Sequence, residues 1–241
     1  MTRRLLEVCV ADPQSLKAAI AGGGDRIELC SGLELGGLTP SAGLMRLAAA
    51  APIPVYAIVR PRSGDFVSDD ADVDAMLGDI DAIRAAGLAG VVLGASRPNG
   101  ELDLKVLGRL MQQAEGLGST LHRAIDLVPD FAEATEAAFA LGFERILTSG
   151  GVHVALDGVD NIATVLATAR GRIKVMAGSG LTPDNVEALL AAVPVDEVHS
   201  SCASPGPASS APAVRLGFAA ETRRRTDRAV VRAFKAALAL T

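Results

Sequence analysis

Two short stretches decide the fold of this chain, LLEVCV at residues 5–10 and RIELC at residues 26–30. Each is an apolar run that contains a Glu-x-Cys pair. Successive side chains of a strand point to opposite faces, so Glu7 and Cys9 share one face while the leucine and valines around them share the other. The apolar face suits a covering layer of helices, and the polar face, where Glu28 and Cys30 repeat the pattern, then points into a barrel.

Further short apolar runs continue along the chain, and longer helical patterns separate them. The predicted strands are Leu5–Val10, Arg26–Cys30, Val55–Arg60, Gly90–Leu93, Ser119–His122, Arg145–Thr148, Lys174–Ala177 and Glu197–Ser200. Strands that alternate with helices favour parallel pairing, and eight such units favour closure into a barrel. The 241 residues are also close to the roughly 250 typical of that fold. The sequence therefore predicts an α/β fold, a single-domain (β/α)8 TIM barrel with parallel strands.

Helix starts and the end of the chain complete this prediction. Asp12-Pro13, Thr39-Pro40 and Thr182-Pro183 each place a capping oxygen before a proline, which predicts the start of a helix. We expect residues 1–204 to form the barrel core. The low-complexity run ASPGPASSAPA at 203–213 predicts a flexible loop, and 226–240 a helix that either completes the barrel wall or packs on a partner subunit. We therefore expect 205–241 to be a loop and a C-terminal helix of the same domain.

Composition excludes several classes of protein. A net charge of −5 argues against a nucleic-acid partner, which needs a basic surface. No apolar stretch reaches about 18 residues without a charge or a proline, so no membrane span is expected. The first apolar run is too short for a signal peptide, and three cysteines do not suggest a secreted disulfide framework. We expect a cytoplasmic protein.

Polar side chains follow several predicted strands, at the end where TIM barrels have their active sites. Burying charges is costly unless they are paired or serve a ligand, so their convergence indicates a functional site. The alternative is a closed ion network in which Glu7, Glu28 and Arg60 only neutralise one another. The residues expected to act in acid–base catalysis are Glu7, Glu28, Arg60, His122, Asp126 and His199, and those expected to bind a substrate are Arg62, Arg123, Ser149, Gly178 and Gly180.

The two glycines belong to a loop, Gly178-Ser179-Gly180, that precedes Thr182-Pro183. Free backbone N–H groups at a helix N-terminus bind anions, and TIM barrels often bind phosphate after strands seven and eight. A tight turn between strand and helix explains the same residues equally well.

The cysteines of the first two strands suggest a metal site. We expect the two Glu-x-Cys pairs to lie at the same height. Cys9 and Cys30 are then within reach of each other, because adjacent strands are about 4.8 Å apart. A disulfide fits this spacing but is disfavoured in a reducing cytosol. Soft thiolates without a histidine or carboxylate at zinc spacing suit Cu(I). Cys202, just after the eighth strand, is a candidate for a third sulfur.

A set of ordered motifs resembles the copper homeostasis protein CutC family over roughly residues 5–204. They are LEVCV (6–10), GGDRIELCS (23–31), GGLTPS (36–41), RPRSGDF (60–66), HRA (122–124), RILTSGG (145–151) and MAGSG (176–180). The resemblance implies a TIM barrel, a cytoplasmic homo-oligomer and a role in copper handling, with Cu(I) on Cys9 and Cys30. Ser63 and Ser179 stand where the family usually has glycine, and Ala177 where it often has proline.

Two functions follow from these observations. The first is a copper homeostasis protein that binds Cu(I) through Cys9 and Cys30 in the barrel mouth. The second is an enzyme that acts by acid–base chemistry on a small anionic or sugar-like substrate, whose carboxylate or phosphate is held by Arg60, Arg62 and Arg123. The expected partner is a copper ion or a small anion, and neither a nucleic acid nor a membrane.

Overall fold

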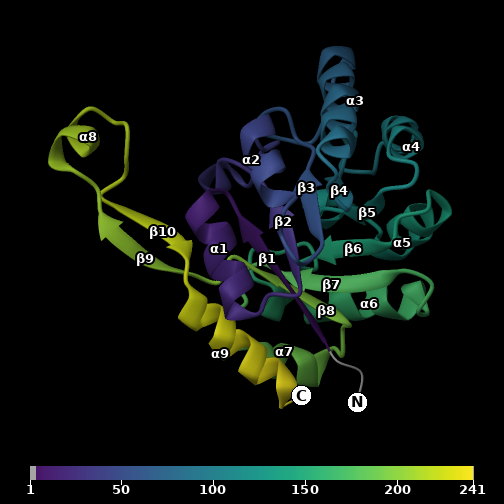
Figure 1. The fold of residues 1–241 in the computed structure, drawn as a ribbon. Coiled ribbons are helices and arrows are strands. Elements are labelled where there is room, and N and C mark those ends of the chain that lie inside the picture. Colours follow the sequence, from purple (N-terminus) through teal and green to yellow (C-terminus); the bar gives the residue numbers. More distant parts are fainter. Residues whose placement is uncertain (1–3, 241) are drawn as a thin grey trace.

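Eight parallel strands close into a barrel in the computed structural model, which describes residues 4–240 (Figure 1). The strands are β1 (Leu5–Val10), β2 (Arg26–Leu29), β3 (Val55–Ile58), β4 (Gly90–Leu93), β5 (Gly118–Leu121), β6 (Arg145–Thr148), β7 (Lys174–Gly178) and β8 (Glu197–Ser200). Strand β8 pairs with β1 and closes the ring. The predicted TIM barrel is confirmed, and β1, β4, β6 and β8 have the predicted bounds.

Helices cover the outside of the barrel. They are α1 (Pro13–Gly22), α2 (Ala42–Ala48), α3 (Asp70–Ala85), α4 (Leu104–Gln113), α5 (Phe131–Ala140), α6 (Val159–Ala169) and α7 (Val186–Ala192). Three short 3-10 helices lie in the loops after β2, β5 and β6, at η1 (Leu33–Leu35), η2 (Arg123–Leu127) and η3 (Ala155–Gly158). Asp12 caps α1 as predicted, because its side chain accepts the N–H groups of Gln14 and Ser15.

The other two predicted helix starts are wrong. Helix α2 begins after Ser41, whose hydroxyl caps it, while the hydroxyl of Thr39 donates to Asp79 instead. Helix α7 begins only at Val186, because a turn at Thr182 comes first. In both places the threonine belongs to the loop that leads to the helix.

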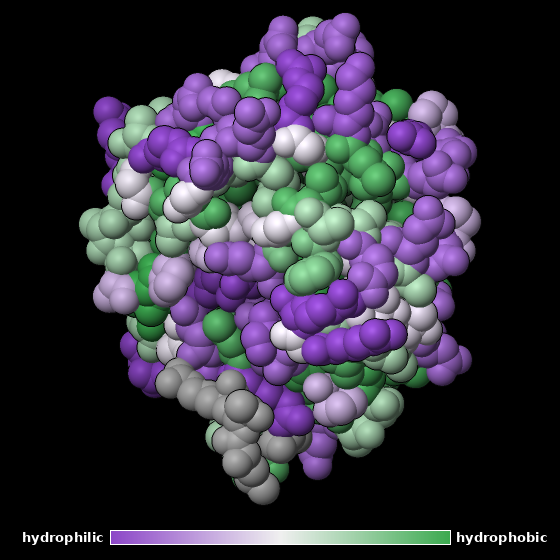
Figure 2. Space-filling model, turned by 90° about the vertical axis from the view of Figure 1, so that its right-hand side faces the viewer, coloured by the Kyte–Doolittle hydropathy of each residue, from purple (hydrophilic) through white to green (hydrophobic). Residues whose placement is uncertain are grey.

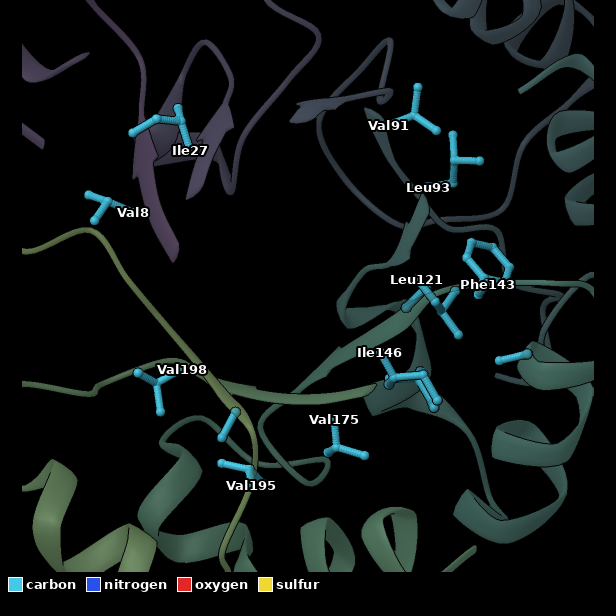
Figure 3. Packing of buried hydrophobic residues seen from close by; sticks show 14 of the residues in the cluster. Val8, Ile27, Val91, Leu93, Leu121, Phe143, Ile146, Val175, Val195 and Val198 are labelled. Atoms are coloured by element: carbon cyan, nitrogen blue, oxygen red, sulfur yellow. The ribbon is translucent and has the colours of Figure 1, made fainter. Parts of the chain in front are cut away.

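The hydrophobic core lies between the barrel and the helices. Its aliphatic side chains come from successive strands and follow one another around the barrel, among them Val8, Ile27, Val91, Leu121, Ile146, Val175 and Val198 (Figure 3). Hydrophilic residues are spread over the face drawn in Figure 2, with smaller hydrophobic groups among them. Within residues 4–240, no helix is long and apolar enough to cross a bilayer.

A two-stranded arm leaves the barrel after β8 (Figure 1). It consists of β9 (Ala203–Ala208) and β10 (Thr222–Thr226), with α8 (Ala211–Arg215) between them. The expected flexible loop is therefore wrong for Ala203–Ala208, which pairs antiparallel with β10. Prolines are tolerated there because both strands are edge strands. The last helix, α9 (Arg228–Ala239), packs beside α1 and α7 and so completes the barrel wall.

Candidate functional site

The register of the strands decides which polar side chains meet inside the barrel. Glu7 lies level with Arg26, and Cys9 lies level with Glu28. His199 of β8 lies level with Glu7 on the other side of β1. The expectation that the two Glu-x-Cys pairs share one height is wrong, because closing a barrel staggers each strand against the next.

An ion-pair network occupies the barrel toward the amino ends of the strands. Arg26 donates to both Glu7 and Glu197, and the guanidinium of Arg145 lies 3.2 Å from the Glu197 carboxylate. Both guanidinium groups face the Tyr56 ring, Arg26 at 5.4 Å and Arg145 at 4.9 Å from its centroid. The charge that balances Glu7 is therefore Arg26 of the neighbouring strand, and not Arg60 as in the alternative of a closed ion network.

The carboxyl groups of Glu7 and Glu28 have opposite electrostatic environments. Burial opposes ionisation of Glu7, but the charges of Arg26 and His199 lower its pKa to about 2. Burial raises the pKa of Glu28 to about 7, because the charge of His199 does not compensate for it. His199 is buried as well, yet the charges of Cys9 and Glu28 hold its pKa well above the usual value. Glu28 is thus the carboxyl group that can hold or release a proton near neutral pH.

A cavity of about 480 Å³ opens at the carboxyl ends of the strands. It is lined by seven of the residues expected at a functional site, and by apolar and polar side chains from the loops around them. The expected residues that line it are Cys9, Glu28, Arg60, His122, Arg123, Gly180 and His199. The position agrees with the active sites of TIM-barrel enzymes.

The imidazole of His122 borders this cavity and is only 4 % exposed. Its Nδ1 accepts the N–H of Ala124 at 3.1 Å, while its Nε2 has no hydrogen-bond partner within residues 4–240. Burial, together with the charge of Arg60, lowers the pKa of His122 to about 3. His122 is therefore a neutral imidazole, and because Nδ1 is the acceptor, Nε2 carries the proton. Gly94 makes room for the ring, since a Cβ there would lie 1.9 Å from it.

Arg60 is held by backbone carbonyl groups. It donates to the oxygens of Leu35 at 2.8 Å, Gly37 at 3.0 Å and Gly64 at 2.8 Å, and it lies over the Phe66 ring. Its Nε is buried without a partner in the described part of the chain. The alternative in which Arg60 only neutralises buried carboxylates is therefore wrong.

Asp126 and Ser149 anchor the loops rather than line the cavity. The Asp126 carboxylate accepts from Arg123 at 2.7 Å, from the Thr148 hydroxyl at 2.5 Å and from the hydroxyl of Ser149 at 2.9 Å. It also accepts the backbone N–H groups of Ser149 and Gly151. Because its oxygens are engaged, Asp126 is suited to fixing Arg123 at the edge of the cavity.

Two further predicted substrate-binding residues, besides Ser149, lie away from the cavity. Arg62 is 45 % exposed on the surface, where it pairs with Asp65 at 3.3 Å and Asp72 at 2.8 Å. Gly178 is packed against the strand before it, since a Cβ there would lie 2.7 Å from Leu147.

The glycine loop is not a helix N-terminus. Gly180 lines the cavity with a positive φ of 70°, but α7 begins only at Val186. The hydroxyl of Ser179 donates to the carbonyl of His153 at 2.6 Å, which ties the loop to its neighbour. The turn explanation of the loop is the one that the geometry supports.

The three thiols lie in different surroundings. Cys9 lines the cavity, and its ligand atom and those of Glu28 and His199 all lie within 4.8 Å of one another. Cys30 is not part of this group; it donates to the carbonyl of Val10 at 3.4 Å, and burial raises the pKa of its thiol strongly. Burial also raises the pKa of Cys202 to about 11.

Three residues that shape the site were not among those expected. Arg26 shares the inward face of its strand with Glu28, so the alternation of RIELC could have indicated it. Phe66 packs against His122 with ring centroids 4.7 Å apart and the ring planes tilted by 43°, and Arg224 of β10 lines the cavity. Both come from outside the barrel strands, where strand periodicity carries no information.

Comparison with known proteins agrees with the motifs. The CutC family model matches residues 4–204. The chain belongs to the CutC family. A family protein CutC from Sinorhizobium medicae is 58% identical over 238 residues, which cover 99% of this chain and 97% of the relative. One from Caulobacter vibrioides is 54% identical over 242 residues, covering 99% of this chain and 98% of the relative.

Solved structures support the same assignment. The CutC protein of Streptococcus agalactiae, whose name assigns it provisionally to copper homeostasis, has a TM-score of 0.78 and is 29% identical. The match covers 82% of this CutC chain and 98% of that one. Thiamine phosphate pyrophosphorylase from Pyrococcus furiosus, at 16% identity and a TM-score of 0.59, shares the fold alone. Residues 205–241, with most of the arm, lie outside the segment that the family model matches.

Proposed function

We propose that the cavity is the active site of an enzyme that binds a small organic anion and moves a proton on it. The observation that carries this proposal is the Nε2 of His122, a buried donor without a partner among residues 4–240 that borders the cavity. Leaving such a group unpaired costs about 1–3 kcal/mol. An acceptor atom of a ligand would remove that cost, and a neutral imidazole can polarise it.

The charges around the cavity support an anionic ligand. Arg60, Arg123 and Arg224 line it, and guanidinium groups match the geometry of a carboxylate or phosphate. Glu28 lines the same cavity and is the carboxyl group placed to move a proton.

A thermal-shift screen with small carboxylates and organic phosphates tests this proposal. At a ligand concentration of about 100 Kd, binding adds roughly 2.7 kcal/mol, which raises the Tm of a chain of this size by about 5–10 °C. His122→Asn and Arg123→Met should lose this shift. Arg62→Met is the matched control, because Arg62 lies outside the cavity, and it should keep the shift. If no anion raises the Tm, or if Arg62→Met abolishes the shift as well, the proposal is wrong.

Copper handling, implied by the family, is a second candidate function. Cys9 supports it, because its thiol lines the cavity. Cys30 fits less well as a thiolate ligand, since it is buried among Tyr56, Ile58 and Val92. In a competition titration with a Cu(I) chelator, we expect Cys9→Ser to lower the affinity more than Cys30→Ser. Equal losses would support the pair of cysteines that we predicted, and no loss in either would place copper elsewhere.

We also propose that the protein forms a homo-oligomer in the cytoplasm. The arm supports assembly, because it projects from the barrel (Figure 1) and exposes Leu216 by 62 % and Phe218 by 81 %. Exposed apolar side chains on a projecting element are typical of protein–protein contacts.

A further inference from the structure

Three different donor groups meet at one wall of the cavity. They are the thiol of Cys9 on β1, the carboxylate of Glu28 on β2 and the imidazole of His199 on β8, and their ligand atoms all lie within 4.8 Å of one another. Strands β8, β1 and β2 are neighbours in the closed barrel. Barrel closure therefore supplies the histidine and carboxylate that we did not find at zinc spacing in the sequence.

The imidazole of His199 is oriented by a second carboxylate. Its Nδ1 lies 2.9 Å from Oε1 of Glu7, and Arg26 holds that carboxylate in place. Its Nε2, 3.8 Å from Oε2 of Glu28, faces the other donors. A histidine that donates one ring N–H to a carboxylate and presents its other nitrogen is the usual arrangement of a metal-binding histidine.

We propose that Cys9, Glu28 and His199 form a binding site for a divalent zinc-type cation. Mixed sulfur, nitrogen and carboxylate donors suit Zn²⁺, whereas Mg²⁺ and Ca²⁺ take oxygen ligands and Cu(I) favours soft thiolates. Two nitrogen or oxygen ligands of a tetrahedral zinc ion are about 3.4 Å apart, so the carboxylate and the imidazole need to close by only a few tenths of an ångström.

The site has the form of a catalytic metal centre rather than a structural one. Catalytic zinc sites have three protein ligands and one open position, and structural sites have four protein ligands. All three donors line the cavity, so the fourth position faces the space where the proposed anion binds. A cation there would polarise an oxygen of that anion in place of proton transfer by Glu28. The metal site itself does not rest on the proposed function, because Cys9, Glu28 and His199 lie together whether or not a substrate exists.

The experiment is a zinc titration of the reduced, metal-free protein against a competing fluorescent chelator. We expect one Zn²⁺ per chain, and a loss of affinity of about 100-fold or more in Cys9→Ser and in His199→Gln. Cys30→Ser is the matched control, because it removes a neighbouring buried thiol outside the donor group, and it should bind as the wild type does. Thermal unfolding of each variant checks that it is folded, and Glu28→Gln replaces any variant that is not.

Cobalt gives a readout that reports the ligands themselves. Co²⁺ in the wild type and in Cys30→Ser should show a thiolate-to-metal charge-transfer band, and Cys9→Ser should lack it. Glu7→Gln keeps the three donors, so it should retain the band while the zinc affinity falls by about 10–100-fold. Zinc binding that is unchanged in Cys9→Ser, or that Cys30→Ser weakens equally, overturns the proposal. If zinc binds as expected but no anion raises the Tm, only the proposed enzyme function is contradicted, and the metal site stands.

Discussion

Replacing His122 by asparagine should make the protein less sensitive to mild acid. His122 has a pKa of about 3 in the folded chain, because burial and the charge of Arg60 disfavour the imidazolium, against an ordinary value of 6.5. Between these two values the unfolded chain binds a proton that the folded chain does not, so stability is lost as the pH falls below 6.5. Asparagine does not titrate, and its side-chain oxygen can still accept the N–H of Ala124.

The size of this effect follows from proton linkage. Protonation of His122 in the unfolded chain lowers the free energy of unfolding by less than roughly 0.1 kcal/mol at about pH 7.5. At about pH 5 this loss reaches roughly 2 kcal/mol. Urea unfolding of both proteins at these two pH values measures it. Between the higher and the lower pH, the free energy of unfolding of the wild type should fall by about 2 kcal/mol more than that of His122→Asn, since the other titrating groups act equally in both proteins. If both proteins lose the same free energy of unfolding, His122 is protonated in the folded protein, and its assignment as a neutral hydrogen-bond donor to the cavity is wrong.

Three further results are expected. Arg26→Met should lower the free energy of unfolding in urea by about 3–5 kcal/mol, because the buried carboxylates of Glu7 and Glu197 each lose one of their charged partners. Arg60→Met should cost less, since Arg60 donates only to backbone carbonyl groups, and equal costs would contradict this. Gly118→Ala should lower the Tm, because its Cβ would lie 2.0 Å from the Tyr56 hydroxyl, and an unchanged Tm would refute that packing. Phe218→Ser should reduce the oligomer mass in light scattering if the arm joins subunits, and an unchanged mass would exclude that contact.

The barrel and its inward-facing residues could be predicted because they depend on local patterns. Strand alternation alone placed Glu7, Cys9 and Glu28 on the inner face, and the ends of strands pointed to Arg60 and His122. Local patterns failed in the loops. A threonine before a proline predicts a helix start, but at Thr39 and Thr182 the helix begins further along the chain. The prediction that Arg62 binds a substrate failed for a related reason. The side chain of a residue that follows a strand can point to the protein surface as easily as into the cavity, and Arg62 pairs with Asp72 on the surface.

The sequence by itself therefore determined the fold, the family and the faces of the strands, because side-chain alternation and helix periodicity are set by each segment's own residues. Only the tertiary structure decided which residues meet. Closing eight strands into a ring fixes a stagger between neighbours that no single strand encodes. That stagger pairs Glu7 with Arg26, sets Cys9 beside Glu28 rather than Cys30, and brings His199, from the last strand of the barrel, to both carboxylates.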